Sequence, residues 1–178
     1  MGISFMKNLP RDLESYLQND VTLLRAMKCV FLKLSFQAVI LFRFACVLRK
    51  VKILTPVALF IDYISTILTS CHISSTAKIG PGFCLPHASG VVIGEGVELG
   101  RDCTVYQGVT IGRKTYDIDA YPQLGDKVVI YSGSCVIGDI HIGNNVIIGT
   151  NSTVLKNVLS DHIVAGSPAK VVGYAKDC

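Results

Sequence analysis

His87 is the residue of this chain best suited to chemistry. It stands in the stretch L-P-H-A-S-G-V-V, where a regular pattern of the sequence is interrupted. An imidazole exchanges its proton near neutral pH, so a histidine in such a place suits a general base. The alternative is a histidine that only fills a corner of the fold. We therefore take His87 as the first candidate for chemistry.

A second set of candidate residues lies between Ile111 and Leu124, where the pattern is interrupted again. The segment 113–122, R-K-T-Y-D-I-D-A-Y-P, carries four charges and two tyrosines. Such a segment predicts a loop that projects from the fold. Insertions between repeats often gather on a binding face, although a solvated surface loop is an equal alternative at this stage.

The interrupted pattern is an aliphatic residue at every sixth position. These leading residues are Ile73, Ile79, Leu85, Ile93, Leu99, Val105, Ile111, Leu124, Ile130, Val136, Ile142, Ile148 and Val154. Neither the alternation of an open strand nor the 3.6-residue period of a helix produces a strict six. Glycine often follows a leading residue, as at Gly80 and Gly100, where we expect corners with unusual dihedral angles. Residues 72–178 are therefore predicted to form a three-sided parallel β-helix, so that the fold is mainly β.

Residues 1–71 lack this period and read as helices. We expect one helix to start at Pro10, a second to run from a cap at Asp20 to about Arg49, and a third to run from Thr55 to Thr69. The helical segment is predicted to pack on one end of the β-helix and to cover its open strand edge.

The composition predicts a cytoplasmic protein. Residues 1–71 contain no uncharged apolar run longer than nine residues, which is too short to span a bilayer, and we expect no signal peptide. The seven cysteines are scattered without a C-x-x-C motif. This favours reduced thiols and no metal site.

The basic residues are concentrated in the first part of the chain. Residues 1–71 hold nine Lys and Arg against four Asp and Glu, whereas residues 72–178 hold eight against nine. A basic, apolar helical segment could lie on the inner face of an acidic membrane. Packing on the β-helix or on a neighbouring subunit is the favoured alternative. We expect no binding to nucleic acid, because no aromatic platform accompanies the basic residues.

Four motifs carry a resemblance to a known family. They are L-P-H-A-S-G-V-V-I-G-E-G, V-Y-Q-G-V-T-I-G, the long run that ends in I-I-G-T-N-S-T-V-L-K, and V-A-G-S-P-A-K-V-V-G. The chain resembles the hexapeptide-repeat O-acetyltransferases. Within them it is similar to the serine O-acetyltransferase branch and, in style, to short surface-polysaccharide enzymes of the colanic acid type. The resemblance implies a left-handed β-helix, acetyl-CoA as co-substrate and a homotrimer.

The resemblance also assigns roles to particular residues. It implies that His87 is the general base, and that Ser132 and Thr150 face the pantetheine arm of coenzyme A. Lys156 and Lys170 would approach the phosphates, although a solvated edge of the coil is a serious alternative for both. His72 stands where the family has an aspartate that orients the base, and it could do so through a hydrogen bond.

The chain departs from the serine enzymes in ways that concern the substrate. Pro86 replaces an aspartate, and Asp119-Ala120-Tyr121-Pro122 replaces the family's D-R-H-P. Loss of that arginine removes a bidentate partner for a carboxylate. We therefore expect a sugar hydroxyl, of a surface-polysaccharide unit, as acceptor, bound by Tyr121, Asp119 and Asp117.

Two alternatives remain open at the level of the sequence. The first is acetylation of serine. The second is a trimeric scaffold without catalysis, which His72, Pro86 and Arg113 keep open because each departs from the family pattern.

Overall fold

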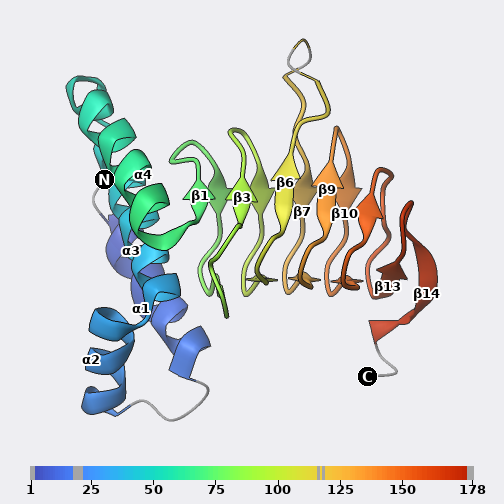
Figure 1. Ribbon diagram of the computed structural model, residues 1–178, viewed down its shortest axis with the longest axis horizontal. Coiled ribbons are helices and arrows are strands. Elements are labelled where there is room, and N and C mark those ends of the chain that lie inside the picture. The colour runs from blue at the N-terminus through green and yellow to red at the C-terminus, as the bar shows by residue number, and fades with distance from the viewer. Residues whose placement is uncertain (1–2, 18–21, 116, 118, 176–178) are drawn as a thin grey trace.

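The computed structural model describes residues 3–17, 22–115, 117 and 119–175, and it places a helical head beside a coil of short strands (Figure 1). The head, residues 3–69, contains α1 (Ile3–Leu17), α2 (Leu23–Leu32), α3 (Leu34–Leu48), the 3₁₀ helix η1 (Lys52–Leu54) and α4 (Thr55–Thr69). The coil, residues 72–175, contains β1 (His72–Ile73), β2 (Lys78–Ile79), β3 (Val92–Ile93), β4 (Glu98–Leu99), β5 (Thr104–Val105), β6 (Thr110–Gly112), β7 (Gln123–Leu124), β8 (Val129–Ile130), β9 (Cys135–Ile137), β10 (His141–Ile142), β11 (Ile147–Ile148), β12 (Thr153–Val154), β13 (His162–Ala165) and β14 (Lys170–Tyr174).

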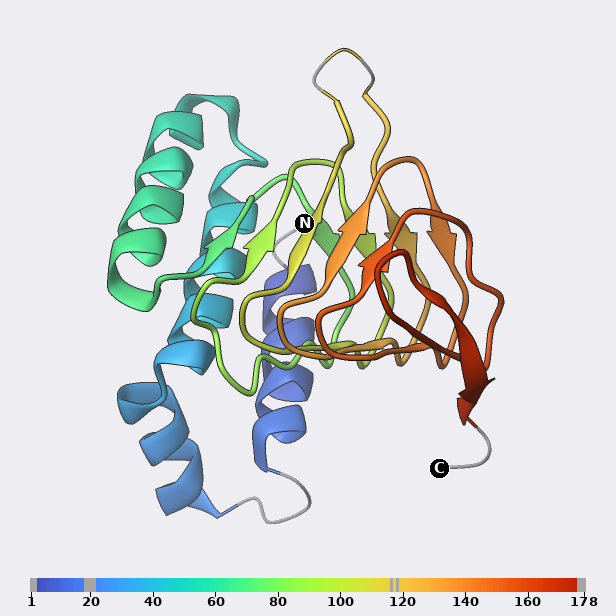
Figure 2. The ribbon, with the colours of Figure 1, turned by 45° about the vertical axis from the view of Figure 1, so that its right-hand side comes forward.

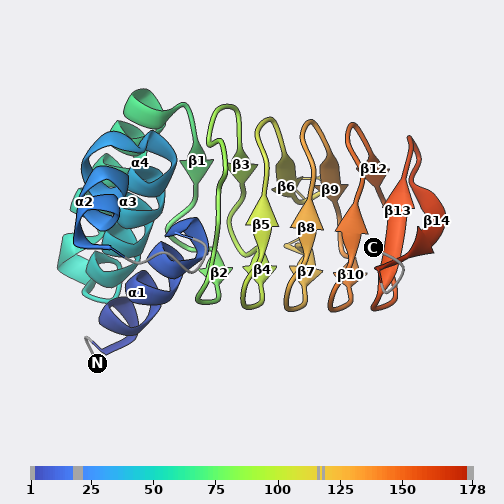
Figure 3. The ribbon, with the colours of Figure 1, turned by 90° about the horizontal axis from the view of Figure 1, so that it is seen from below.

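The strands of the coil form three sheets. Sheet A has the order β1-β3-β6-β9-β12, sheet B the order β10-β7-β4-β2, and sheet C the order β14-β13-β11-β8-β5. Successive strands within a sheet pair in parallel, except for the antiparallel β13–β14 hairpin at the end. Figure 3 shows the coils side by side along the axis. The predicted left-handed β-helix is confirmed.

The six-residue pattern produces the core of the coil. Every leading residue points inward and is at most 7% exposed. Burying one such side chain contributes about 1.5–3 kcal/mol, so the repeated pattern supplies much of the driving force for this fold. Ser134 and Ser152 are also buried inside, where the Ser134 hydroxyl donates to the Gly149 carbonyl oxygen over 2.7 Å.

The glycines after the leading residues serve close packing between coils. Gly80 and Gly100 are outside the left-handed region, so the expectation of unusual dihedral angles was wrong for them. A Cβ atom on Gly80 would lie 2.5 Å from the carbonyl oxygen of Gly100. The missing side chain therefore lets neighbouring coils approach.

The head differs from its prediction in two places. Helix α1 begins at Ile3, so Pro10 lies inside it, and the expected start at Pro10 was wrong. Packing of Leu9 and Leu13 against a small apolar cluster outweighs the low helix propensity of proline. The expected helix to Arg49 is broken at Lys33 into α2 and α3, with a bend of 79°. The bend lets Cys29 and Phe36 enter that same cluster, while the expected cap at Asp20 lies outside the described residues.

The head covers the first coil, as expected. The buried Asp12 carboxylate of α1 accepts hydrogen bonds from Arg43 Nε of α3 over 2.9 Å and from the Phe83 N–H of the coil over 2.9 Å. Arg43 also donates to the carbonyl oxygens of Ile79 and Gly80. Two helices and the coil are thus joined by one buried, fully hydrogen-bonded ion pair.

The head also exposes apolar surface. By length and composition the stretch Lys52–Thr69, which comprises η1 and α4, could cross a membrane, so the expectation that residues 1–71 hold no stretch long enough was wrong. Of this stretch 22% is buried. The same test passes α2 and α3 only as a bent pair.

Candidate functional site

His87 lies on a turn, residues 85–90, that connects sheet C to sheet A. The head and Ser70, which directly follows α4, hold the two ends of this turn. The Leu85 N–H donates to the Tyr16 hydroxyl oxygen over 2.9 Å, and the Gly90 N–H donates to the carbonyl oxygen of Ser70 over 2.7 Å. The His87 side chain itself is exposed. The structure therefore presents an accessible imidazole on a turn whose backbone is fixed.

A cavity of about 380 Å³ lies beside His87, called here the His87 cavity. It is lined by Leu32, Lys33, Leu34, Ser35, Thr69, Pro86, His87, Ala88 and Ser89. The break between α2 and α3 and the end of α4 thus form one wall, and the His87 turn forms the other.

The same corner of the coil continues as a row away from His87. We call it the C/A edge: residues 85–90, 105–108, 130–133 and 148–151. Backbone hydrogen bonds of 2.9–3.0 Å join Gly108 to Ser89, Gly133 to Gln107, and Asn151 to Ser132. The structure therefore places Ser132 and Thr150 in line with the His87 turn.

The two candidate lysines lie in different places. Lys170 pairs with Ala165 in the β13–β14 hairpin, and the preceding Val164 accepts a hydrogen bond from Gly149. Lys170 is therefore at the end of the C/A edge. Lys156 follows β12 at the opposite end of that strand and is exposed.

Sequence reasoning missed two tyrosines on the C/A edge. Tyr106 and Tyr131 stack, with ring centroids 5.0 Å apart and ring planes at 26°. Each directly follows a leading residue, where glycine is more usual in this chain. That exception was the signal that could have revealed them.

Figure 2 shows the described residues of the segment 113–122 standing out from the coil. Its base and the outer face of sheet A enclose a cavity of about 400 Å³, called the loop cavity, which includes His72, Glu95, Arg113 and Tyr121 in its lining. The base of the loop thus lines a cavity, so the loop is more than a solvated projection.

Tyr121 is the best-packed of the candidate loop residues. The Arg113 guanidinium lies 5.7 Å from the centroid of its ring, and Asp119 lies 4.0 Å from Arg113. Loss of solvation, together with a hydrogen bond to Asp119, raises the pKa of Tyr121. Tyr121 and Asp119 therefore gather around one cation, whereas Asp117 lies exposed farther along the loop.

His72 also belongs to the loop cavity. Its Nδ1 is 3.2 Å from the Thr66 hydroxyl oxygen of α4, and that hydroxyl donates to the carbonyl oxygen of Asp62. While it donates to Asp62, the Thr66 hydroxyl can accept from His72 Nδ1–H, and this tautomer leaves Nε2 for another partner. His72 lines the loop cavity and His87 lines the His87 cavity, so the orienting role of His72 stays a prediction.

The buried Cys71 and the half-buried Cys84 are poorly suited to nucleophilic chemistry. Burial raises the pKa of the Cys71 thiol to about 12 and that of the Cys84 thiol, three residues before His87, to about 11. A thiol in this state supplies little thiolate. Among the described residues, no group of three or more His, Cys, Asp or Glu side chains could hold a metal ion.

The fold and the site together define a class. A hexapeptide coil with an accessible imidazole at one end of a long edge can hold an extended cofactor and activate a hydroxyl beside it. These are the features of a hexapeptide-repeat acyltransferase.

Comparison with known proteins agrees with this class. Residues 121–156 match the family model described as bacterial transferase hexapeptide (six repeats). The serine acetyltransferase of Helicobacter pylori is 34% identical over 168 residues, which cover 94% of this chain and 98% of the relative. That of Synechococcus elongatus is 34% identical over 167 residues, covering 93% and 68%. The crystal structure of the Brucella abortus serine acetyltransferase in complex with coenzyme A superposes with a TM-score of 0.88 at 28% identity, covering 96% and 68%.

The chain therefore belongs to the serine acetyltransferase family of hexapeptide-repeat transferases. The likeness to surface-polysaccharide acetyltransferases stays a hypothesis, because these relatives bear the serine acetyltransferase name.

Proposed function

We propose that this acetyl-CoA-dependent acyltransferase acetylates the hydroxyl of L-serine. The observation that carries the proposal is the match to the Helicobacter pylori serine acetyltransferase over 98% of that relative's length. This choice replaces the sugar hydroxyl as the leading acceptor. The geometry of the His87 turn supports the reaction itself.

In the proposed mechanism His87 takes the proton of the acceptor hydroxyl. The oxygen then attacks the thioester carbonyl carbon, and the tetrahedral intermediate collapses with loss of coenzyme A as the thiolate, which takes a proton. Both substrates are bound together, and the acetyl group passes directly between them. The raised pKa of the Cys84 thiol, to about 11, supports direct transfer over a covalent acetyl-cysteine.

Coenzyme A is proposed to lie along the C/A edge. The row from His87 through Ser132 and Thr150 to Lys170 supports this placement, with Lys170 near the phosphates as a point charge. A homotrimer would add the neighbouring subunit's coil as the other wall of this groove. Lys156 would then contact the cofactor only if the groove extends to the far end of β12.

The acceptor can be tested by measuring acetyl-CoA consumption with L-serine and with a panel of sugars. We expect efficient turnover with L-serine and a loss of about 10²–10⁴ in kcat for His87→Ala, because general base catalysis typically contributes that factor. Thermal unfolding would check that the variant keeps its fold. If the His87→Ala enzyme stayed active, His87 would not be the general base.

A sugar hydroxyl is the second candidate acceptor, and the loop favours it. Ala120 and Tyr121 provide no cation for a serine carboxylate, while the Tyr121 ring and Asp119 suit a sugar face and its hydroxyl groups. Turnover of a sugar without turnover of L-serine would favour this candidate. A catalytically inactive scaffold predicts instead that coenzyme A leaves the melting temperature unchanged.

The place of action is proposed to be the cytoplasm, with contact between the head and the inner membrane face as a further proposal. Helix α2 exposes Leu23, Leu24, Met27 and Phe31, and Lys28 borders this apolar stripe. Apolar side chains bordered by a cation suit an anionic lipid surface.

A further inference from the structure

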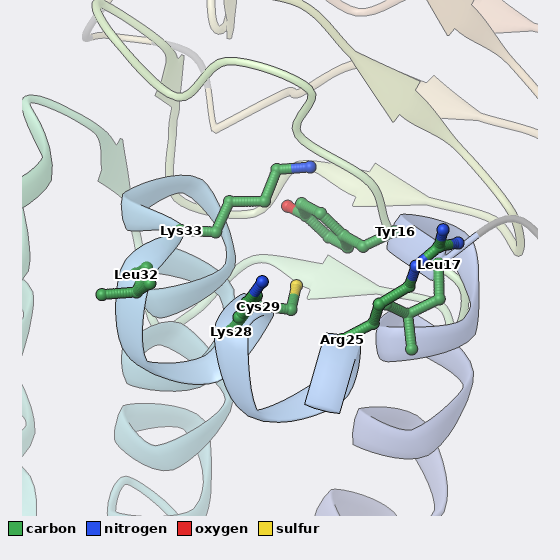
Figure 4. A pocket seen from close by; sticks show the side chains of 7 residues that line it. All are labelled: Tyr16, Leu17, Arg25, Lys28, Cys29, Leu32 and Lys33. Atoms are coloured by element: carbon green, nitrogen blue, oxygen red, sulfur yellow. The ribbon is translucent and has the colours of Figure 1, made fainter. Parts of the chain in front are cut away.

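Lys33 stands at the break between α2 and α3, beside the His87 turn. Its backbone is extended, with φ −99° and ψ 98°, and its side chain is exposed. It lines two cavities: the His87 cavity and a cavity of about 430 Å³ between α1 and α2. Figure 4 shows the second of these, with the amino end of Lys33 beside Tyr16.

Two contacts of Tyr16 tie this lysine to the site. The Lys33 ammonium lies 4.7 Å from the centroid of the Tyr16 ring. The hydroxyl of that same tyrosine accepts from the Leu85 N–H, two residues before His87, and donates to the Ser35 carbonyl oxygen. The charge of Lys33 is therefore held at the base of the His87 turn.

The His87 cavity offers an anion one permanent charge. Among the described residues that line this cavity, Lys33 is the only lysine, arginine, aspartate or glutamate. Its neighbours Leu32 and Leu34 are apolar, and Thr69 donates its hydroxyl to the Ser65 carbonyl oxygen. An acceptor with its hydroxyl at His87 would therefore meet Lys33 as its cationic neighbour from the head.

We propose that Lys33 binds the carboxylate of the acceptor in the His87 cavity. This inference rests on the proposed function, because the carboxylate is that of L-serine. It explains how the enzyme binds an amino acid although Ala120 stands where the family has an arginine. The four-carbon stem of lysine lets the ammonium leave the Tyr16 ring for the carboxylate, and an exposed cation–π contact is weak enough to exchange.

The chain offers a matched control in Lys28. It lies on α2, is exposed, and lines the cavity between α1 and α2 without lining the His87 cavity. Lys33→Gln and Lys28→Gln remove the same charge from the same region of the head. They therefore separate a general electrostatic effect from a contact in the site.

The test is to measure kcat and KM of the full chain with L-serine and with L-serinamide, which lacks the carboxylate. We expect Lys33→Gln to raise KM for L-serine about tenfold or more, because hydrogen bonds to charged groups are among the stronger ones. The kcat should change much less, and the preference for L-serine over L-serinamide should fall by the same factor. Lys28→Gln should resemble the wild type, and Lys33→Arg should keep the preference.

The outcomes separate this role from the proposed function. If Lys33→Gln and Lys28→Gln turned over L-serine with equal KM, the proposed role of Lys33 would be overturned. The proposed function would stand. Absence of L-serine turnover in the wild-type enzyme would overturn the proposed function and this role with it. Lys33→Met, which keeps the stem, repeats the test if Lys33→Gln unfolds at a lower temperature than Lys28→Gln.

Discussion

The coil and the head organise their apolar residues in opposite ways. In the coil each leading residue is at most 7% exposed, and the pattern that buries it is local and repeated. In the head, large apolar side chains such as Leu23, Ile53 and Phe60 are 61–83% exposed. The head keeps its position through Ala38, Val39 and Phe42 of α3, which join the buried core of the coil, and through a few polar contacts with the first coil. The coil thus supplies the C/A edge, while the head fixes the turn that carries His87.

The largest effect should come from breaking the buried ion pair between head and coil. Asp12→Ala leaves Arg43 buried without its partner, which typically costs about 3–5 kcal/mol of unfolding free energy. Urea denaturation would measure this loss. Arg11→Ala breaks exposed pairs with Glu14 and Asp102 and should cost far less, because solvent screens exposed ion pairs. Equal losses in the two variants would show that the buried pair does not hold the head.

The exposed apolar surface of the head gives a second contrast. Phe31→Ser should weaken binding to anionic vesicles about tenfold, because it removes one large apolar side chain from the α2 stripe. Leu159→Ser removes a similarly exposed side chain, 74% against 69%, from the coil and should have no effect. Co-sedimentation with vesicles of neutral and anionic lipid would measure both.

Two other results would count against the membrane proposal. Absence of binding to anionic vesicles by the wild-type chain would end it. A change in the sedimentation coefficient of Phe31→Ser without lipid would instead assign the stripe to a contact between copies of this chain.

The smallest effect should come from the loop cavity. A Cβ atom on Gly96 would lie 2.5 Å from a ring carbon of Tyr121, and Gly96 has a positive φ of 65°, so Gly96→Ala should displace the ring. For a sugar acceptor held by the Tyr121 ring we expect an increase of about two- to fivefold in KM, the scale of one weakened contact. Gly173→Ala on β14 is the control, since its Cβ would make only an ordinary contact of 3.7 Å and Gly173 does not line the loop cavity. Unchanged kinetics in Gly96→Ala would exclude Tyr121 from acceptor binding.

The coil was predictable because its information is local. Each leading residue from Ile73 to Val154 is buried at a position that its six-residue spacing fixes. The break at Lys33 and the helix through Pro10 were not predictable, because packing in a distant cluster decides them. The hydrogen bond from Leu85 to Tyr16 joins residues 69 apart, and no sequence period marks such a contact.

The candidate site was predictable only in part for the same reason. The sequence pattern and the family resemblance pointed to His87, and the backbone ladder then placed Ser132 and Thr150 along the same edge. The separation of His72 from the His87 cavity depends on α4, which supplies Thr66 as the hydrogen-bond partner. The cavity beside His87 depends on where α2 and α3 meet, which the repeat does not encode.

The Tyr16→Phe variant tests most directly whether the head holds the turn that carries His87. This change removes the oxygen that accepts from the Leu85 N–H but keeps the ring under Lys33. An unpaired, part-buried N–H should loosen the turn and lower kcat about tenfold, with a smaller change in acceptor KM. Tyr63→Phe on α4 is the control, because Tyr63 is 61% exposed. A Tyr16→Phe enzyme with the kcat of Tyr63→Phe would contradict this account, whereas a selective loss of kcat in a folded protein would support it.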